Sequence, residues 1–240
     1  MLGRTHATTG ALAVTAATAT HLFGFSPAPG AELLDVLLFA GAALLPDLDC
    51  DHSQASLELR EELGFLSLAF LKLIELLSGG HRHGTHSIVG IGVFTAFDVA
   101  GSRAAAHLPG AWGHHAPQVL LGFYIALMIG AALRALRLSS HAHDFAGIAA
   151  AAAIVLTGYD LSILPWAIAI GATVHVLGDM ITEGECPIFW PFTKRHFGLP
   201  LFRVGGLAEG FILVLATLGT LALLGVQLGS QAVSYLHAGA

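Results

Sequence analysis

The stretch His81-Arg82-His83-Gly84-Thr85-His86-Ser87 stands immediately before a long apolar run that begins at residue 88. Ionisable groups at the edge of a membrane segment are costly to desolvate, so they usually face a bundle interior or a water-filled cavity. Histidine is also the commonest metal-binding side chain. Thr85 or Ser87 can cap the helix that follows. The stretch therefore predicts a membrane helix with a functional cluster at its start.

The composition of the whole chain agrees with a membrane protein. Hydrophobic residues make up 55% and charged residues 11%, against roughly 25% charged residues in ordinary soluble domains, and the mean hydropathy is +0.75. We expect an all-α, polytopic transmembrane helical bundle in which residues 1–240 form a single integral membrane domain. The net charge of −6 and the lack of a basic run argue against direct nucleic-acid binding. The lipid bilayer is the expected partner, and the oligomeric state stays open.

The apolar segments predict about seven spans, judged against the roughly 20 residues that cross a bilayer core. They cover residues 7–25, 31–46, 86–101, 116–134, 144–159, 161–181 and 207–227. Residues 57–77 carry apolar side chains at helical spacing, but charged side chains interrupt them. That pattern is typical of an amphipathic helix at the membrane interface. A short true span is the alternative for this segment.

The expected topology places all the polar clusters on one side of the membrane. If residues 57–77 lie flat, each cluster falls on the side of the N-terminus. Nine of the ten lysine and arginine residues fall on that side as well, and only Arg103 falls opposite. By the positive-inside rule this side is cytoplasmic. The sequence therefore predicts a protein of a prokaryotic-type inner membrane, with its N-terminus and site cytoplasmic and its C-terminus outside.

Histidines and aspartates at the ends of the expected helices are candidate metal ligands. His175 and Asp179 are four residues apart and project from one helix face, although a hydrogen-bonded pair at a helix end has the same spacing. Asp47 and Asp49 follow Pro46, which places two oxygen ligands on an irregular backbone. A simple solvated turn would have the same sequence pattern and is the alternative. The full set of expected metal ligands is His6, Asp47, Asp49, His81, His86, His175 and Asp179.

Three further residues are candidates for catalysis. Arg82 has a fixed fork of donors that suits a phosphate, and a positive-inside anchor is the alternative. Glu209 enters an apolar helix, where an acid is costly and needs a partner, so it could act as ligand, general base or hydrogen-bond acceptor for a ligand. Asp51 is the other acid without a ligand role and is a second candidate for the general base.

The expected cofactor is one or two divalent metal ions, most suitably Zn, with Mn or Fe as alternatives for mixed histidine and aspartate ligands. Paired ions suit hydrolysis because they lower the pKa of bound water. With Arg82 nearby, a phosphate ester or lipid-like molecule is the expected substrate of such a hydrolase. Two other function classes fit the same residues. A divalent-metal transporter would place ligands near mid-bilayer, and a non-catalytic regulatory protein would use a closed, structural metal site.

Four short motifs in order resemble the YdjM-like family of membrane-bound metal-dependent hydrolases. They are Thr5-His6, Leu45-Pro46-Asp47-Leu48-Asp49, His81-Arg82 with Thr85-His86-Ser87, and His175 with Asp179 through Trp190-Pro191-Phe192. The resemblance covers about residues 5–211 and implies an inner-membrane hydrolase, also described as LexA-binding. This chain departs from the family pattern in one place, because Cys50 and Asp51 separate Asp49 from His52, where such sequences commonly have a histidine directly after the second aspartate.

Overall fold

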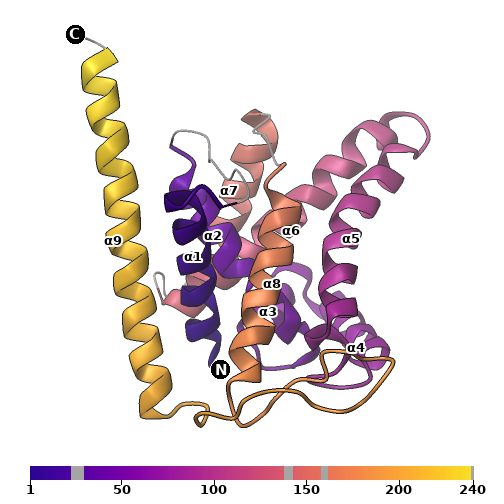
Figure 1. The fold of residues 1–240 in the computed structure, drawn as a ribbon. Coiled ribbons are helices and arrows are strands. Elements are labelled where there is room, and N and C mark those ends of the chain that lie inside the picture. Colours follow the sequence, from indigo (N-terminus) through magenta and orange to yellow (C-terminus); the bar gives the residue numbers. More distant parts are fainter. Residues whose placement is uncertain (23–29, 138–142, 158–161, 239–240) are drawn as a thin grey trace.

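The computed structural model describes residues 1–22, 30–137, 143–157 and 162–238. Over these ranges the chain forms helices and no β-strand, only isolated bridges in the loop 181–206. The elements are α1 (Gly3–Ala19), α2 (Glu32–Ala42), η2 (Leu45–Asp49), α3 (Gln54–Leu63), α4 (Phe65–Ser78), η3 (Gly84–His86), α5 (Ile88–Ala106), α6 (Ala111–Leu136), α7 (His143–Thr157), α8 (Leu164–Met180) and α9 (Leu207–Ala238), where η denotes a 3-10 helix (Figure 1). The expected all-α class is confirmed.

Three of the described helices are long and apolar enough to cross a membrane, and the expectation of seven spans is not supported. These helices are Ile88–Ala106, His115–Leu136 and Leu207–His237. Helix α2 has 11 residues and rises about 16 Å, half of the roughly 30 Å core. Helices α1, α7 and α8 have 17, 15 and 17 residues and rise about 22 to 26 Å. Parts of the expected spans 7–25, 144–159 and 161–181 lie outside the described residues.

Helix α2 is apolar because it forms the centre of the protein. It packs against α1, α6 and α8, and its Leu38 and Phe39 are fully buried. A helix that is hydrophobic on all sides has the same sequence pattern whether other helices or lipid surround it, and here other helices surround it. The expected span 31–46 therefore ends early, at Ala42, and the chain turns into η2, where Pro46 occupies the first turn.

Two glycines bring the neighbouring helices very close to α2. A Cβ atom on Gly171 of α8 would lie 2.7 Å from the Cβ of Ala42, and one on Gly10 of α1 would lie 2.6 Å from the carbonyl oxygen of Phe39. Both distances are too short for a side chain. Small residues at such contacts let helix backbones approach closely. The approach places α1 and α8 beside the end of α2, where η2 begins.

Residues 57–77 do not form one amphipathic helix as expected. They are divided between α3 and α4 at Gly64, which has a φ of +55°. Helix α3 packs on α6, where its fully buried Glu58 accepts a hydrogen bond of 2.9 Å from Nε of Arg134. Helix α4 exposes apolar side chains, including Phe65 at 81% and Leu76 at 75%. Glu58 of the first half thus forms an ion pair inside the protein, whereas Glu61 stays 43% exposed, and α4 keeps the exposed apolar face expected at an interface.

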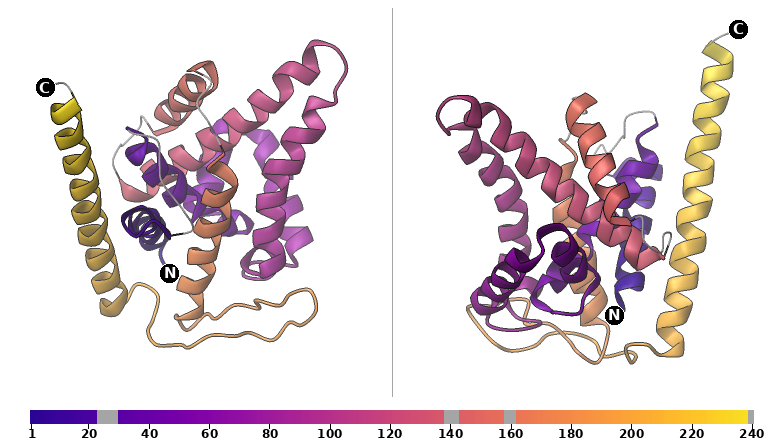
Figure 2. Two further views of the ribbon diagram at one scale, coloured as in Figure 1. Left: turned by 45° about the horizontal axis from the view of Figure 1, so that its top comes forward. Right: turned by 180° about the vertical axis from the view of Figure 1, so that it is seen from behind.

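The outer elements lie on opposite sides of the bundle, and one end of the bundle is covered by a loop. Helix α9 stands to one side and packs mainly on α1, whereas the α5–α6 hairpin projects on the opposite side (Figures 1 and 2). The loop 181–206 passes across the end of the bundle where the N-terminus lies, and the C-terminus lies at the far end of α9 (Figure 1). The first turns of α1, both 3-10 helices and the end of α8 therefore meet at the end closed by this loop.

Candidate metal centre

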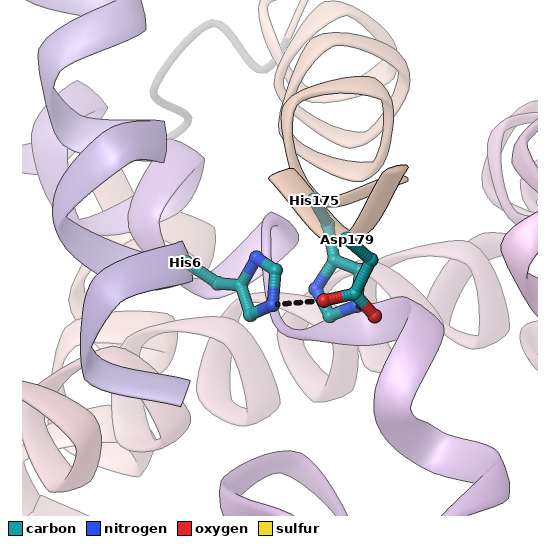
Figure 3. A group of neighbouring side chains, drawn as sticks. All are labelled: His6, His175 and Asp179. Atoms are coloured by element: carbon teal, nitrogen blue, oxygen red, sulfur yellow. Dashed lines mark hydrogen bonds and ion pairs between the residues drawn. The ribbon is translucent and has the colours of Figure 1, made fainter. Parts of the chain in front are cut away.

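Four segments bring histidine and aspartate side chains together at that end of the bundle. His6 comes from α1, Asp47 from η2, His86 from η3, and His175 and Asp179 from the last turns of α8. The three histidines have no exposed surface, and Asp179 is 1% exposed. Figure 3 shows the side chain of His6 projecting from α1 toward His175 and Asp179 of α8. Burial of the three histidines and Asp179 requires that each of these four groups be paired, whereas the Asp47 side chain is 18% exposed.

His175 is oriented by the backbone of the α2–η2 connection. Its Nδ1 lies 2.7 Å from the carbonyl oxygen of Ala43. Because a carbonyl can only accept, Nδ1 carries the proton and donates it. The other ring nitrogen, Nε2, then presents its lone pair to the interior of the cluster. This arrangement, with one nitrogen donating to a carbonyl and the other free, is typical of metal-binding histidines.

His86 is oriented by a neighbouring hydroxyl and a carboxylate. Thr85 Oγ1 donates to Asp49 Oδ2 at 2.5 Å and lies 3.0 Å from Nδ1 of His86. The hydroxyl has one proton and gives it to the carboxylate, so Nδ1 of His86 must be the donor in the second contact. Nε2 of His86 consequently faces the cluster, 3.1 Å from Nε2 of His175. We call this chain of contacts the Asp49–Thr85–His86 relay.

Two carboxylate oxygens complete a four-atom arrangement around the paired imidazoles. Asp47 Oδ1 lies 3.5 Å from Nε2 of both His86 and His175. Asp179 Oδ2 lies 3.7 Å and 3.8 Å from the same two atoms. Ligand atoms at about 2.0–2.2 Å from a tetrahedral zinc ion lie about 3.3–3.6 Å from one another. Of these atoms, those of Asp47, His86 and His175 all lie within 4.8 Å of one another and fit a single divalent ion, with Asp179 Oδ2 beside both histidine nitrogens as a candidate fourth ligand.

The same contacts place a proton on His86 in metal-free protein. Burial alone would lower its pKa, but the hydrogen bonds and negative charges of Asp47 and Asp49 raise the pKa of His86 to about 9. Burial likewise opposes ionisation of Asp49, but hydrogen bonds from His81, His86 and Thr85 lower its pKa to about 2. Protonated His86 donates from Nε2 to the lone pair of His175. A bound ion would replace this one proton.

A second group lies at the solvent-exposed edge of the first. Asp47, Asp49 and His81 offer ligand atoms within 4.8 Å of one another. Nδ1 of His81 is 2.9 Å from Asp49 Oδ1, and the His81 side chain is 46% exposed. Asp49 also accepts from the backbone N–H of Arg82 at 3.1 Å. Because Asp47 belongs to both groups, two ions bound here would share its carboxylate.

His6 and Asp179 form a third group with His175. The His6 ring stacks on that of His175 with centroids 3.6 Å apart, and its Nε2 is 3.2 Å from Asp179 Oδ1 (Figure 3). The Met1 amine also donates to Oδ1 of Asp179. These contacts hold one carboxylate oxygen, whereas the other oxygen, Oδ2, faces His86 and His175. His6 is thus placed to orient the carboxylate as well as to bind.

The three candidate catalytic residues lie in different surroundings. Nη2 of Arg82 is 3.2 Å from Asp179 Oδ2, so this guanidinium touches the cluster, and its side chain is 21% exposed. Asp51 lies at the surface with 67% of its side chain exposed and pairs with Arg60 at 3.0 Å. Within the described chain, Asp51 belongs to none of the three ligand groups.

Glu209 has the contacts of a structural acceptor. It is 2% exposed and accepts hydrogen bonds from the backbone N–H of Leu2 at 2.5 Å and of Gly205 at 2.6 Å. It too lies outside the three ligand groups found among the described residues. The carboxylate ties the first residues of α1 to the start of α9. It thereby supports the position of Met1 and His6 beside Asp179.

Sequence reasoning missed the relay that orients His86. Ser87 caps α5 as expected, accepting from the N–H of Gly90 at 3.1 Å, but Thr85 serves Asp49 and His86 instead. The signal available was the position of Thr85, directly before a histidine and in the same motif. The Ala43 carbonyl that orients His175 has no signal in the sequence, because any residue supplies a carbonyl.

The fold and the cluster together define a helical membrane protein with a buried candidate metal centre at one end of its bundle. A family model described as "YdjM inner membrane protein" matches residues 1–237. The chain belongs to this family, which confirms the resemblance seen in its motifs. Comparison with curated proteins and with solved structures finds no match.

Proposed function

We propose that this protein is a membrane-bound, metal-dependent hydrolase acting on a phosphate ester or lipid-like substrate. One observation carries the proposal. The imidazole nitrogens of His86 and His175, whose other nitrogens are engaged as donors, face each other at 3.1 Å between two carboxylates. Two acceptor atoms held this close inside a protein need a cation or a proton between them.

The proposed buried ion is held by Asp47, His86, His175 and Asp179. A second ion is held by Asp47, Asp49 and His81, which leave a coordination position open toward solvent. Zn suits these mixed nitrogen and oxygen ligands, with Mn or Fe as alternatives. A divalent ion in an open site lowers the pKa of bound water and neutralises charge on phosphate oxygens.

The chain also places a positively charged side chain, that of Arg82, beside the proposed metal ligands, where it can bind the substrate. Arg82 reaches Asp179 and is partly exposed, so its guanidinium can bind a phosphate oxygen at the edge of the cluster. Lys194 and Arg195 are exposed on the loop 181–206 at the same end. We assign Arg82 the role of substrate binding. The roles of Asp51 and Glu209 as general base remain predictions, and their present contacts favour neither.

The position of the cluster favours a hydrolase over a transporter. Transport sites lie near mid-bilayer on broken helices, whereas these ligands gather at one end of the bundle. The exposed three-ligand group favours catalysis over a purely structural metal, which would use closed coordination. We further propose that this end is cytoplasmic and that the C-terminus is outside, in keeping with the distribution of basic residues. Cysteine labelling that placed residues 50 and 185 on opposite sides would contradict this topology.

Metal analysis of purified protein tests the proposal first. The wild-type protein should contain a divalent ion, His86→Ala should lose it, and the control His237→Ala should retain it because His237 is exposed on α9. Metal-loaded protein should then hydrolyse a member of a phosphomonoester, phosphodiester and phospholipid panel. Asp179→Ala should remove both metal and turnover.

Two results would replace the proposal with one of its rivals. Metal-loaded protein that hydrolyses nothing in the panel, yet carries divalent ions into liposomes in a manner that depends on His86, would identify a transporter. Bound metal that supports neither turnover nor transport, but whose removal unfolds the protein, would identify a structural site.

A further inference from the structure

A cavity of about 600 Å³ lies between α9 and the faces of α1, α2 and α6. Figures 1 and 2 show α9 at the edge of the bundle, where it packs on α1. Apolar side chains such as Leu37 of α2, Leu133 of α6 and Leu221 of α9 line most of the cavity. Helices α6 and α9 contain two of the three candidate spans. When these two helices cross a bilayer, a groove between them would face lipid.

Three threonines in the groove add to its apolar character. The hydroxyl groups of Thr8, Thr217 and Thr220 each donate to a backbone carbonyl of their own helix, four residues earlier, at 2.7–2.8 Å. Their hydrogen-bonding capacity is thus used within the helix, a common arrangement for threonine in membrane helices. The walls therefore offer a ligand mostly hydrocarbon.

Two arginines are the only charged residues among the described residues that line this groove. Arg4 lies in the first turn of α1, and Arg137 follows the last residue of α6. Both are exposed, and within the described chain neither guanidinium has an ion-pair or hydrogen-bond partner. Arg4 also borders a neighbouring cavity that contains Glu209, but that carboxylate is buried and accepts from two backbone amides. The groove thus combines an apolar wall with two uncompensated positive charges.

We infer that this groove binds one anionic phospholipid taken from the bilayer. An acyl chain lies against the leucines of α2, α6 and α9, and the phosphate lies between Arg4 and Arg137. Guanidinium groups match phosphate oxygens with paired donors. Basic pockets between membrane helices bind anionic head groups for this reason. None of the proposed metal ligands lines the groove, so the inference goes beyond the proposed function and does not depend on hydrolysis.

Native mass spectrometry of the full chain in detergent tests the site. The protein is titrated with phosphatidylglycerol and, separately, with phosphatidylcholine of the same acyl chains. One phosphatidylglycerol should be retained per chain at concentrations where phosphatidylcholine is not. Arg4→Gln and Arg137→Gln should each weaken retention about fivefold, as expected for one basic residue near an anionic lipid. Arg103→Gln is the matched control, because it removes an exposed charge from the end of α5, and it should change nothing.

A second variant tests the groove without altering its charge. Thr217→Phe places a ring in the cavity from the exposed side of α9 and should reduce retention of phosphatidylglycerol while leaving the helical circular dichroism unchanged. Equal retention of the two lipids would overturn the inference, as would equal behaviour of the double arginine variant and the Arg103→Gln control. Displacement of the lipid by millimolar inorganic phosphate, or a dimer peak in place of the lipid adduct, would also overturn it.

Discussion

Replacing Thr85 with valine removes the central group of the relay that orients His86. Valine keeps the shape of threonine, but Nδ1 of the fully buried His86 loses its acceptor and Asp49 loses a donor 2.5 Å away. Losing a hydrogen-bonding partner of a metal ligand typically costs 10- to 100-fold in metal affinity, or about 1.4–2.8 kcal/mol. The unpaired donor should also destabilise the metal-free fold by about 1–3 kcal/mol.

Competition with a zinc-binding dye measures the first effect, and thermal unfolding measures the second. Thr173→Val is the control, because the Thr173 hydroxyl donates to a carbonyl of its own helix on the exposed side of α8. Its metal affinity should equal that of the wild type. If Thr85→Val binds zinc as tightly as this control while His86→Ala does not bind it, the relay has no part in orienting His86 and the reasoning fails.

Three further predictions concern individual acids and the cluster histidine. Because the pKa of His86 is raised to about 9, zinc must displace a proton from this residue. The affinity of the protein for zinc should therefore rise about tenfold per pH unit up to about pH 9 and then level off. A zinc affinity that is independent of pH between 6 and 8 would contradict this. The same raised pKa stabilises metal-free protein below the ordinary value of 6.5, and this contribution is lost as pH rises through about 9. Asp51→Ala breaks a surface pair with Arg60 and should lower the free energy of unfolding by less than about 1 kcal/mol; loss of turnover with metal retained would instead assign Asp51 as the base. Glu209→Gln turns an amide NH₂ toward a backbone N–H and should destabilise the protein by about 1–3 kcal/mol without removing metal, as thermal unfolding and metal analysis would show; unchanged stability with abolished turnover would restore the general-base role.

The helical class could be predicted from sequence, but the number of spans could not. Hydropathy measures how apolar a helix is and does not reveal what covers it. Leu38 and Phe39 of α2 are buried by other helices, yet they read like residues that face lipid. Within residues 57–77 the charge of Glu58 misleads in the converse way, because Glu58 is buried and paired with Arg134, which lies 76 positions further along the chain.

The sequence predicts which residues of the candidate centre could bind a metal, but it does not predict which of them contact one another. The spacing of His175 and Asp179 predicts that they share a helix face. In the structure, Nε2 of His175 lies 3.8 Å from Oδ2 of Asp179. The contact of Arg82 with Asp179 and the relay through Thr85 depend on how η2, η3 and α8 pack. No local pattern encodes such packing, because its partners are far apart in the chain.

The contact between His6 and Asp179 joins residues 173 positions apart. During synthesis, the histidine of the first helix is made long before the carboxylate that it meets. His175 and Asp179 are synthesised only after about three quarters of the chain, so the contact with His6 forms only when α8 has packed against α1, and the proposed set of Asp47, His86, His175 and Asp179 forms only when α8 has packed beside η2 and η3. An ion held there would report that η2, η3 and α8 have come together, and a chain truncated before α8 would lack two of the four proposed ligands.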